Sequence, residues 1–379
     1  MKVVVAMDSF KGSLTSLQAG EAVREGIRKV RENADVVVKP LGDGGEGTAE
    51  ALINELKGKQ IRVKVTGPMG NPIEAMYGIL PDGKTAVMEM AQAAGITLCK
   101  DKNPLAASTF GVGEMIIDAM KKGCVEFLIG IGGSATNDGG IGLLKALGYE
   151  FFQENGELAG EGGGSLIKIA RISGEKVLPQ IAECHFHIAC DVNNPLCGPL
   201  GATYIYGPQK GATEDNLKEL EAGMRNYAAL TKEYTGKDYS EHPGAGAAGG
   251  LGFCFLAYLK GQLMPGIEMV MKAVNLEEEI KEADYVITGE GRLDGQSGMG
   301  KAPVGVAALA KKYHKKVIAF AGSVTKEAAI CNFLGIDAFF PVVRGVTTLE
   351  EAMDPVNATE NLRDTTEQVF RLLEKHVEY

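Results

Sequence analysis

Short apolar runs alternate with segments of helical periodicity from the N-terminus onward. Residues 3–7 are continuously apolar and predict a buried strand. The apolar positions Leu17, Val23, Ile27 and Val30 then predict a helix over residues 15–30. A second apolar run at 36–38 and a helical segment at 47–56 repeat the pattern. Continuous apolar strands that alternate with helices are typical of a parallel sheet covered on both faces.

The C-terminal third follows the same alternation. It predicts strands at residues 285–288, 317–321 and 338–342, and helices at residues 302–313, 325–334 and 358–376. Both ends of the chain therefore predict the same kind of layered α/β structure.

The middle of the chain has a different pattern. Residues 61–90 are rich in strand-forming residues separated by Gly, Pro and Asp turn signals, which predicts antiparallel strands. A helix at 105–121 and a strand at 125–131 follow, and residues 153–165 read as a glycine-rich surface loop.

The length of 379 residues favours two domains. We predict an α/β chain with a discontinuous, Rossmann-like parallel-sheet domain made of residues 1–60 and 280–379. Residues 61–279 would form an inserted mixed α/β domain, with the active site in the cleft between the two. One large continuous sheet is the alternative.

Composition narrows the function classes. The net charge is -10 and no tract is dense in Lys or Arg, which argues against a nucleic-acid partner. No apolar stretch approaches the length of a membrane span, and the N-terminal apolar run is too short for a signal peptide. Seven irregularly spaced cysteines without a C-x-x-C pair indicate a reducing compartment. We therefore expect a cytoplasmic protein.

Polar, glycine-rich segments follow the strands of the predicted first domain, where parallel sheets bind ligands. The first strand is followed by Asp8, Ser9 and Lys11 rather than by the G-x-G-x-x-G of a dinucleotide site, although Ser13 or Thr15 could simply cap the next helix. After the second strand, Asp43 and Glu46 lie among four glycines, as Mg²⁺ ligands or as solvated acids of a turn.

Three further segments belong to the predicted inserted domain. Residues 129–140 could form an anion nest of backbone N–H groups, and their candidate binding residues are Gly132, Gly133, Ser134, Asn137 and Asp138. Asp191 follows an apolar strand and precedes two asparagines. It could act as a base or as a metal ligand, or the segment could simply begin an Asn-Pro turn. The glycines of residues 243–252 either cradle phosphate or allow close helix packing; the candidates are Gly246, Gly249 and Gly250.

The segment from residue 288 to residue 302 combines acids and cations. Its spacing from Gly295 to Lys301 matches a P-loop, but Ala302 stands where a Ser or Thr would hold Mg²⁺, so we reject a P-loop NTPase. Lys301 at a helix start is still a candidate for a phosphate contact. Glu290 and Asp294 are candidate metal ligands.

Six of these segments together resemble the bacterial glycerate kinase family: MDSFKGSLTS, PLGDGGEGT, GIGGSATNDGGIG, CDVNNPLCGP, PGAGAAGGLG and ITGEGRLDGQS. The blocks run from residue 7 to residue 297, and the whole length fits. The resemblance implies phosphorylation of D-glycerate by ATP, with 2-phosphoglycerate as the expected product. It also implies two α/β domains with the site between them.

Phosphoryl transfer needs an anion cradle, a metal site, a cation and a group that orients the hydroxyl. We expect Asp191 to be the base, with Asp8 as its rival, and Lys11 to be catalytic. Mg²⁺ would bind Glu290, Asp294 and Asp43, while Arg292 or Ser134 would meet the glycerate carboxylate.

Two other function classes stay open at this point. A nucleotide-dependent oxidoreductase could act on the same hydroxy-acids, but the missing G-x-G-x-x-G counts against it. A non-catalytic binding protein could share the inserted-domain architecture, although such proteins are usually exported. The protein would act as a monomer or a homodimer.

Overall fold

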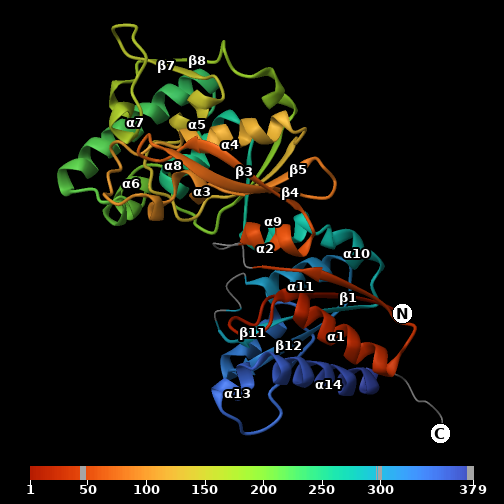
Figure 1. Cartoon of the computed structure of the whole chain (residues 1–379). Coiled ribbons are helices and arrows are strands. Elements are labelled where there is room, and N and C mark those ends of the chain that lie inside the picture. Colours follow the sequence, from red (N-terminus) through yellow and green to blue (C-terminus); the bar gives the residue numbers. More distant parts are fainter. Residues whose placement is uncertain (43–47, 296, 298–300, 374–379) are drawn as a thin grey trace, which may run out of the picture. The chain divides into compact units, whose positions relative to one another are not determined.

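The computed structural model describes residues 1–42, 48–295, 297 and 301–373 (Figure 1). The chain divides into two compact units. Unit 1 contains Met1–Asp43 and Ile267–Tyr379, and unit 2 contains Gly44–Gly266. Each unit has its own sheet and its own apolar core.

Unit 1 is built on a five-stranded parallel sheet with the order β13-β12-β11-β1-β2. Its strands come from both ends of the chain: β1 Lys2–Met7, β2 Asp35–Pro40, β11 Tyr285–Leu293, β12 Lys316–Val324 and β13 Ala338–Pro341. The chain runs outward from β1 to β2 on one side, and from β11 through β12 to β13 on the other. The ends of β1 and β11 therefore lie at the point where the strand order reverses, which is where open parallel sheets bind ligands.

Helices cover this sheet: α1 Ser16–Val30, α10 Leu276–Glu282, α11 Ala302–Lys312, α12 Ile330–Phe333, α13 Leu349–Met353 and α14 Pro355–Leu373. Thr15 and Gln18 form a capping box that begins α1. Helices α1 and α14 pack closely because Gly26 has no side chain: a Cβ there would lie 2.3 Å from the carbonyl oxygen of Arg363.

Unit 2 contains a six-stranded mixed sheet with the order β10-β9-β6-β5-β4-β3. Strands β10, β9, β6 and β5 are parallel to one another, while β3, β4 and β5 pair antiparallel. The strands are β3 Lys59–Thr66, β4 Pro72–Ile79, β5 Thr85–Glu89, β6 Glu126–Gly130, β9 His185–Ala189 and β10 Gln262–Met264. A separate hairpin pairs β7 Glu150–Phe152 with β8 Arg171–Ser173.

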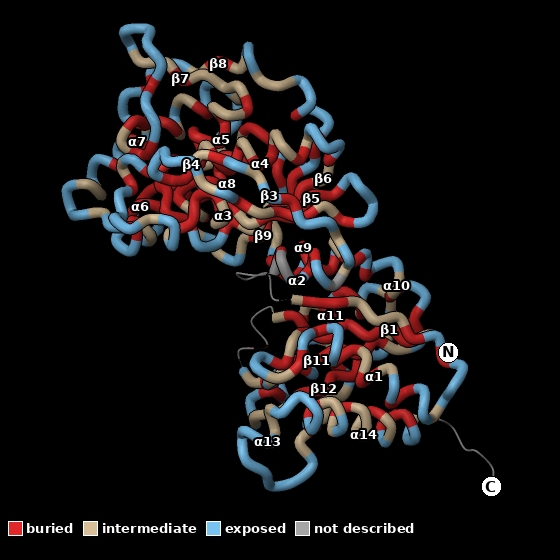
Figure 2. Tube along the Cα trace, in the orientation of Figure 1, coloured by how far each residue is buried: buried red, intermediate tan, exposed pale blue. Residues whose placement is uncertain are grey.

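The α-helices of unit 2 are α2 Thr48–Glu55, α3 Ala91–Ala94, α4 Phe110–Lys121, α5 Ile141–Ala146, α6 Ala202–Tyr206, α7 Glu214–Thr235 and α8 Ala247–Tyr258. Helix α9, Gly266–Ala273, begins at the last residue of this unit. Short 3-10 turns include η1 Ile96–Leu98, η2 Gly163–Lys168, η3 Pro179–Glu183 and η4 Pro208–Lys210. Figure 2 shows that the buried residues concentrate in the sheets and on the helix faces that cover them.

The predicted fold class is confirmed: a parallel-sheet unit formed by both chain ends and a mixed α/β unit between them. The alternative of one continuous sheet is wrong, because β1–β2 and β3–β4 belong to different sheets. In α1, Val23 and Ile27 are buried as predicted, but Leu17 is 37% exposed, and Ala19 and Ala22 complete the buried face.

Two predicted helices differ in length from the observed ones. The helix expected from residue 105 begins only at Phe110, because Thr109 is held by the buried carboxylate of Asp138, which accepts its backbone N–H and its hydroxyl at 2.8 Å each. The helix expected at 325–334 is a 3-10 turn, η6 Lys326–Ala329, followed by the single turn of α12.

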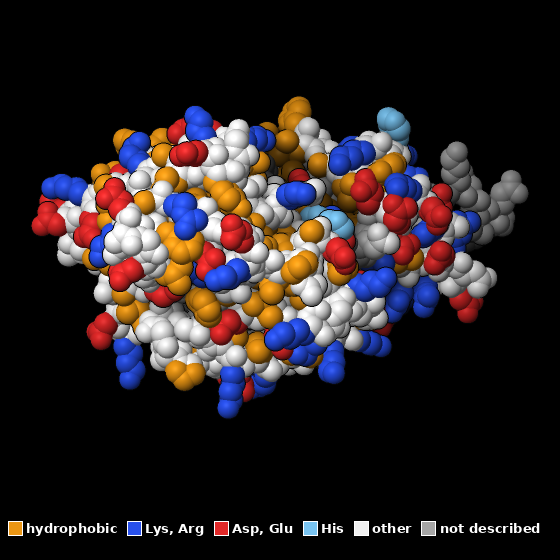
Figure 3. Space-filling model, turned by 90° about the horizontal axis from the view of Figure 1, so that it is seen from above, with side chains coloured by type: hydrophobic (Ala, Val, Ile, Leu, Met, Phe, Trp, Pro, Cys, Tyr) orange, Lys and Arg blue, Asp and Glu red, His pale blue; other side chains and the backbone are white. Residues whose placement is uncertain are grey.

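In the described part of the chain, no helix is long and apolar enough to cross a membrane. On the face of the molecule in Figure 3, Lys and Arg side chains are interspersed with Asp and Glu side chains.

Candidate active site

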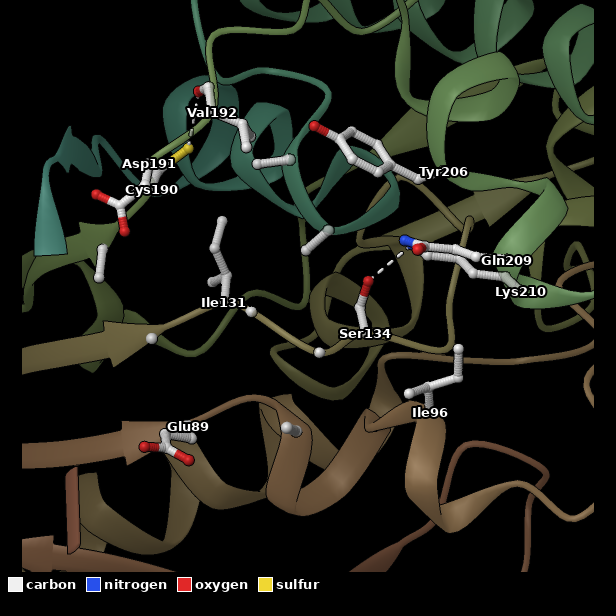
Figure 4. Close-up of a pocket in the computed structure, with 17 residues that line it drawn as sticks. Glu89, Ile96, Ile131, Ser134, Cys190, Asp191, Val192, Tyr206, Gln209 and Lys210 are labelled. Atoms are coloured by element: carbon white, nitrogen blue, oxygen red, sulfur yellow. Dashed lines mark hydrogen bonds between the residues drawn. The ribbon is translucent and has the colours of Figure 1, made fainter. Parts of the chain in front are cut away.

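A cavity of about 420 Å³ lies at the carboxyl ends of the parallel strands β5, β6 and β9 in unit 2 (Figure 4). Each strand contributes its last residue to the lining: Glu89, Gly130 and Ala189. The other lining residues come from α3 and η1 after β5, from the loops after β6 and β9, from α6 and η4, and from the start of α8. The position agrees with the rule that ligands bind beyond the carboxyl ends of parallel strands.

A buried lysine, Lys210 of η4, forms one end of the cavity. Only 2% of its surface is exposed. Its Nζ donates to the hydroxyl of Ser134 and to the carbonyl of Thr136, at 2.7 Å each. Because burial disfavours the charged form, it lowers the pKa of Lys210 to about 7, although the negative charge of Asp138 opposes the shift.

Two carboxylates lie at the other end of the cavity, where Figure 4 shows Asp191 and Glu89 on opposite walls. Asp191 is exposed, and its Oδ1 accepts the backbone N–H of Gly266 at 3.0 Å, which fixes the position of that oxygen. Glu89 accepts the backbone N–H of Ala49, at the start of α2, at 3.1 Å. The cavity is therefore cationic at one end and anionic at the other.

The loop after β6 supplies the predicted residues Gly132, Gly133 and Ser134 to the lining. Backbone pairing with the start of η1 holds this loop: Ile96 N–H donates to Gly133 at 2.8 Å, and Ala135 N–H donates to Ala94 at 2.9 Å. Gly133 has a φ of +73°, which favours glycine. These contacts place the Ser134 hydroxyl against Lys210.

Asn137 and Asp138 are fully buried and do not belong to the lining of the cavity. Asn137 donates to the hydroxyl of Thr203 at 3.0 Å. The carboxylate of Asp138 accepts from Thr109 and from the backbone N–H groups of Gly140 and Gly142, at 3.1 and 3.3 Å. The N–H groups at this turn therefore surround a carboxylate of the protein itself, and burial raises the pKa of that carboxyl.

The glycines at the start of α8 allow close backbone packing. A Cβ on Gly249 would lie 2.0 Å from the carbonyl oxygen of Thr136, and a Cβ on Gly246 would lie 2.2 Å from that of Pro195. Gly250 likewise approaches the backbone of Gly139. Ala248, between them, has a φ of +52° and lines the cavity. These contacts require glycine at all three positions for close packing of the backbone, and a role in binding phosphate stays a prediction.

In unit 1, Asp8 directly follows β1, and Glu290 lies in the adjacent strand β11, in its C-terminal half. The register pairs Met7 with Gly289, and Asp8 N–H donates to the Gly289 carbonyl at 2.8 Å. Both carboxylates are largely buried. Burial raises the pKa of Glu290 and the charge of Asp8 adds to that increase, while a hydrogen bond from Ser297 and the charge of Lys301 oppose it.

The loop after β11 surrounds Glu290 with polar groups. The Ser297 hydroxyl donates to Glu290 at 2.7 Å, and Lys301, the cap residue of α11, has its Nζ 4.0 Å from the same carboxylate. Asp294 lies 3.6 Å from the Arg292 guanidinium and accepts the backbone N–H of Ser297 at 3.3 Å. Two carboxylates and two cations thus gather beside the end of β11.

The remaining predicted residues lie near the same strand end or outside the described structure. Ser9 donates its backbone N–H to Asp8 at 2.6 Å, and Lys11 is exposed on the turn after β1. Residues 43–47, with Asp43 and Glu46, lie outside the described residues.

The fit of Mg²⁺ rests on the carboxylates of unit 1. No group of three or more His, Cys, Asp or Glu residues suited to a metal occurs within residues 1–42, 48–295, 297 and 301–373. Mg²⁺ commonly uses only one or two carboxylates and completes its octahedron with water and phosphate oxygens. Glu290 and Asp294 supply that number of hard oxygen donors, so this part of the protein suits a magnesium–phosphate complex.

Reasoning from the sequence missed Lys210 and Glu89. Glu89 ends an apolar strand as Asp191 nearly does, so the same rule about strand ends would have found it. Lys210 lies in the turn at residues 207–211, GPQKG. The one signal in the sequence is that it is the single charged residue of this turn.

We expect Lys210→Met to alter how stability depends on pH. The pKa of Lys210 is about 7 in the fold and near 10.5 in the unfolded chain, so the unfolded chain binds the extra proton between these values. Burying the charged lysine lowers the free energy of unfolding of wild type. This loss is full below pH 7 and decreases as the pH rises toward 10.5. The stability advantage of the variant over wild type should therefore fall from pH 7 to pH 10, by up to about 1.4 kcal/mol per pH unit. Urea unfolding of both ligand-free proteins measures this; parallel pH curves would contradict it.

Comparison with known proteins identifies the family. Residues 3–374 match the glycerate kinase family. A protein of Halalkalibacterium halodurans named glycerate kinase is 48% identical over 353 residues, covering 93% of each chain. The Escherichia coli (strain K12) protein named glycerate 2-kinase is 46% identical over 93% of each chain.

A solved structure of a Salmonella typhimurium LT2 protein assigned as glycerate kinase 2 has the same fold. Its TM-score is 0.84 at 42% sequence identity, over 98% of both chains. With the matches above, this shows that the chain is an enzyme and belongs to the glycerate kinase family.

Proposed function

We propose that this enzyme phosphorylates D-glycerate with ATP and Mg²⁺, giving 2-phosphoglycerate and ADP. The observation that supports this best is the cavity at the ends of β5, β6 and β9, with a buried lysine at one end and two carboxylates at the other. A small hydroxy-acid has the complementary halves: an anionic carboxylate and neutral hydroxyls. The relatives named for glycerate phosphorylation support the same substrate.

In the proposed reaction, Asp191 is the general base. As the hydroxyl oxygen at carbon 2 forms a bond to the γ-phosphorus of ATP, the bond from that phosphorus to the bridging oxygen of ADP breaks. The hydroxyl proton passes to Oδ2 of Asp191, whose Oδ1 is held by Gly266 N–H. Glu89 on the opposite wall would orient the hydroxyl.

The groups beside the ends of β1 and β11 would serve the nucleotide. Glu290 and Asp294 would hold Mg²⁺, which when bound neutralises charge on the phosphates. Lys301 and Lys11 would contact phosphate oxygens, and Arg292 would add a further cation near Asp294. Asp8, which follows the adjacent strand β1, would be a further catalytic carboxylate and is the rival base.

The direct test is to combine D-glycerate, ATP and Mg²⁺ with the purified enzyme and to measure ADP by a coupled assay. We expect ADP to form in proportion to glycerate and EDTA to stop turnover. Replacing ATP by NAD should give no change in absorbance from NADH. Folded enzyme that releases no more ADP with glycerate than without it would contradict the proposed function.

We also propose that the enzyme works in the cytoplasm. All seven cysteines lie in the described part of the chain and all are free thiols. Reduced cysteines are typical of the cytosol. The protein would act as a monomer or a homodimer.

A further inference from the structure

Lys210 is a buried amine that donates hydrogen bonds to two neutral groups of the protein. Its Nζ donates to a hydroxyl, Ser134, and to a carbonyl, Thr136. An ammonium group has three donors, and Lys210 lines the cavity, so one donor remains for a ligand. Over the described ranges of the chain, Lys210 forms no ion pair with a carboxylate.

Among the described residues, the charged and titratable groups near Lys210 provide no close counter-ion. Asp138 lies beneath the loop, where its carboxylate is already bound by Thr109 and by backbone N–H groups. Lys102 donates to the carbonyl of Gln209, next in the chain, at 3.0 Å and adds positive charge. Tyr206 donates its hydroxyl to Asn194 at 2.6 Å, and burial raises its pKa. The carboxylates of Glu89 and Asp191 lie at the far end of the cavity (Figure 4).

A buried ammonium without a counter-ion is costly, and proteins relieve that cost by pairing the charge or by losing the proton. The lowering of its pKa to about 7 shows the same cost, because burial without a close counter-ion disfavours the charged amine. An anion in the cavity would supply the missing partner and favour the protonated form.

We propose that Lys210 binds the carboxylate of the hydroxy-acid substrate, and that its amine takes up a proton from solvent as this anion enters the cavity. The identity of the anion rests on the proposed function. Ser134 accepts from Lys210, so its own hydroxyl proton is available to the second carboxylate oxygen. This fixes the orientation of the substrate: the carboxylate lies at the lysine end, and the hydroxyls extend toward Asp191 and Glu89.

The arrangement also determines specificity. A substrate with a carboxylate forms an ion pair with Lys210, which offsets the free-energy cost of burying its charge. Glycerol and glyceramide have no anionic group and cannot do so. These neutral analogues keep the hydroxyls but leave the amine of Lys210 unpaired, so they should bind at least about 100-fold more weakly than glycerate.

Isothermal titration calorimetry of D-glycerate into the enzyme measures proton uptake directly. Titrations in two buffers of different ionisation enthalpy, with and without Mg-ADP, give the protons taken up per bound ligand. We expect clear proton uptake at pH 8 that decreases as the pH is lowered and is nearly absent at pH 5.5, where the free enzyme already holds the proton. Glycerate that binds at pH 8 without proton uptake would overturn the inference while leaving the proposed function intact.

Variants of Lys210 test whether this residue is the group that takes up the proton. Lys210→Met should lose proton uptake and bind glycerate about 100-fold more weakly or worse, whereas Lys210→Arg, which is always charged, should lose the uptake alone. Lys102→Met is the matched control, because Lys102 contacts the same turn without lining the cavity; it should keep both properties. If neither Lys210 variant folds, the pH series on wild type decides the question by itself.

The other outcomes also separate the two claims. Proton uptake with ATP but not with glycerate would overturn the assignment of Lys210 to the hydroxy-acid. If glycerate does not bind under any of these conditions while another small carboxylate binds with proton uptake, then the proposed substrate is wrong and the role of Lys210 as an anion-coupled lysine stands.

Discussion

Replacing Asp191 by asparagine should lower kcat by about 10²–10⁴-fold, the range that a general base contributes. The carboxylate lines the cavity, and one of its oxygens is fixed by the backbone of Gly266. Asparagine keeps the size of the side chain but cannot accept the hydroxyl proton. ATP affinity should change little, and steady-state kinetics with both substrates measure the two effects separately.

Two isosteric variants control for this result. Glu89→Gln removes the other carboxylate of the same cavity and should cost much less in kcat, because we assign Glu89 to orientation. Asp8→Asn tests the rival base at the end of β1. If Asp191→Asn retains most of its kcat while Asp8→Asn is inactive, the base belongs to unit 1 and our assignment is wrong.

The double variant Glu290→Gln, Asp294→Asn should lower kcat/KM by about 100-fold at a fixed, subsaturating Mg²⁺ concentration. Both changes keep the shape of the side chains but remove the hard anionic donors that Mg²⁺ prefers. Glutamine can still accept the hydrogen bond from Ser297, so the fold at the end of β11 should persist. Part of the loss should be recovered as the Mg²⁺ concentration rises.

A Mg²⁺ titration of activity at saturating glycerate separates metal binding from other effects. We expect the half-maximal Mg²⁺ concentration to rise, with the KM for glycerate nearly unchanged. Glu327→Gln is a suitable control, since this exposed acid follows β12 near the same loop without belonging to the proposed site. An unchanged Mg²⁺ requirement in the double variant would move the metal to Asp43 or Glu46.

The fold was largely predictable because its strands are continuous apolar runs. Residues 3–7 appear as β1, and the predicted strands of the C-terminal third appear as β11, β12 and β13. Where prediction failed, a tertiary contact decided the outcome. Helix α4 begins late because Asp138, distant in sequence, binds Thr109, and periodicity within residues 105–121 contains no trace of that contact.

The candidate site was predictable where strand ends carry it. Asp191, Gly132, Gly133 and Ser134 line one cavity because parallel strands β6 and β9 end at the same edge of the sheet. Lys210 could not be found in this way, since it comes from a turn after α6. Its importance arises from burial beside Ser134, which only the folded chain creates.

The most direct test of this account is a crystal structure of the enzyme with D-glycerate and a non-hydrolysable ATP analogue. We predict that the glycerate carboxylate lies within about 3 Å of the amine of Lys210, and that the hydroxyl at carbon 2 lies within about 3 Å of Asp191, as hydrogen bonds require. Glycerate bound outside this cavity, or bound with its carboxylate beside Asp191 and Glu89, would contradict the account.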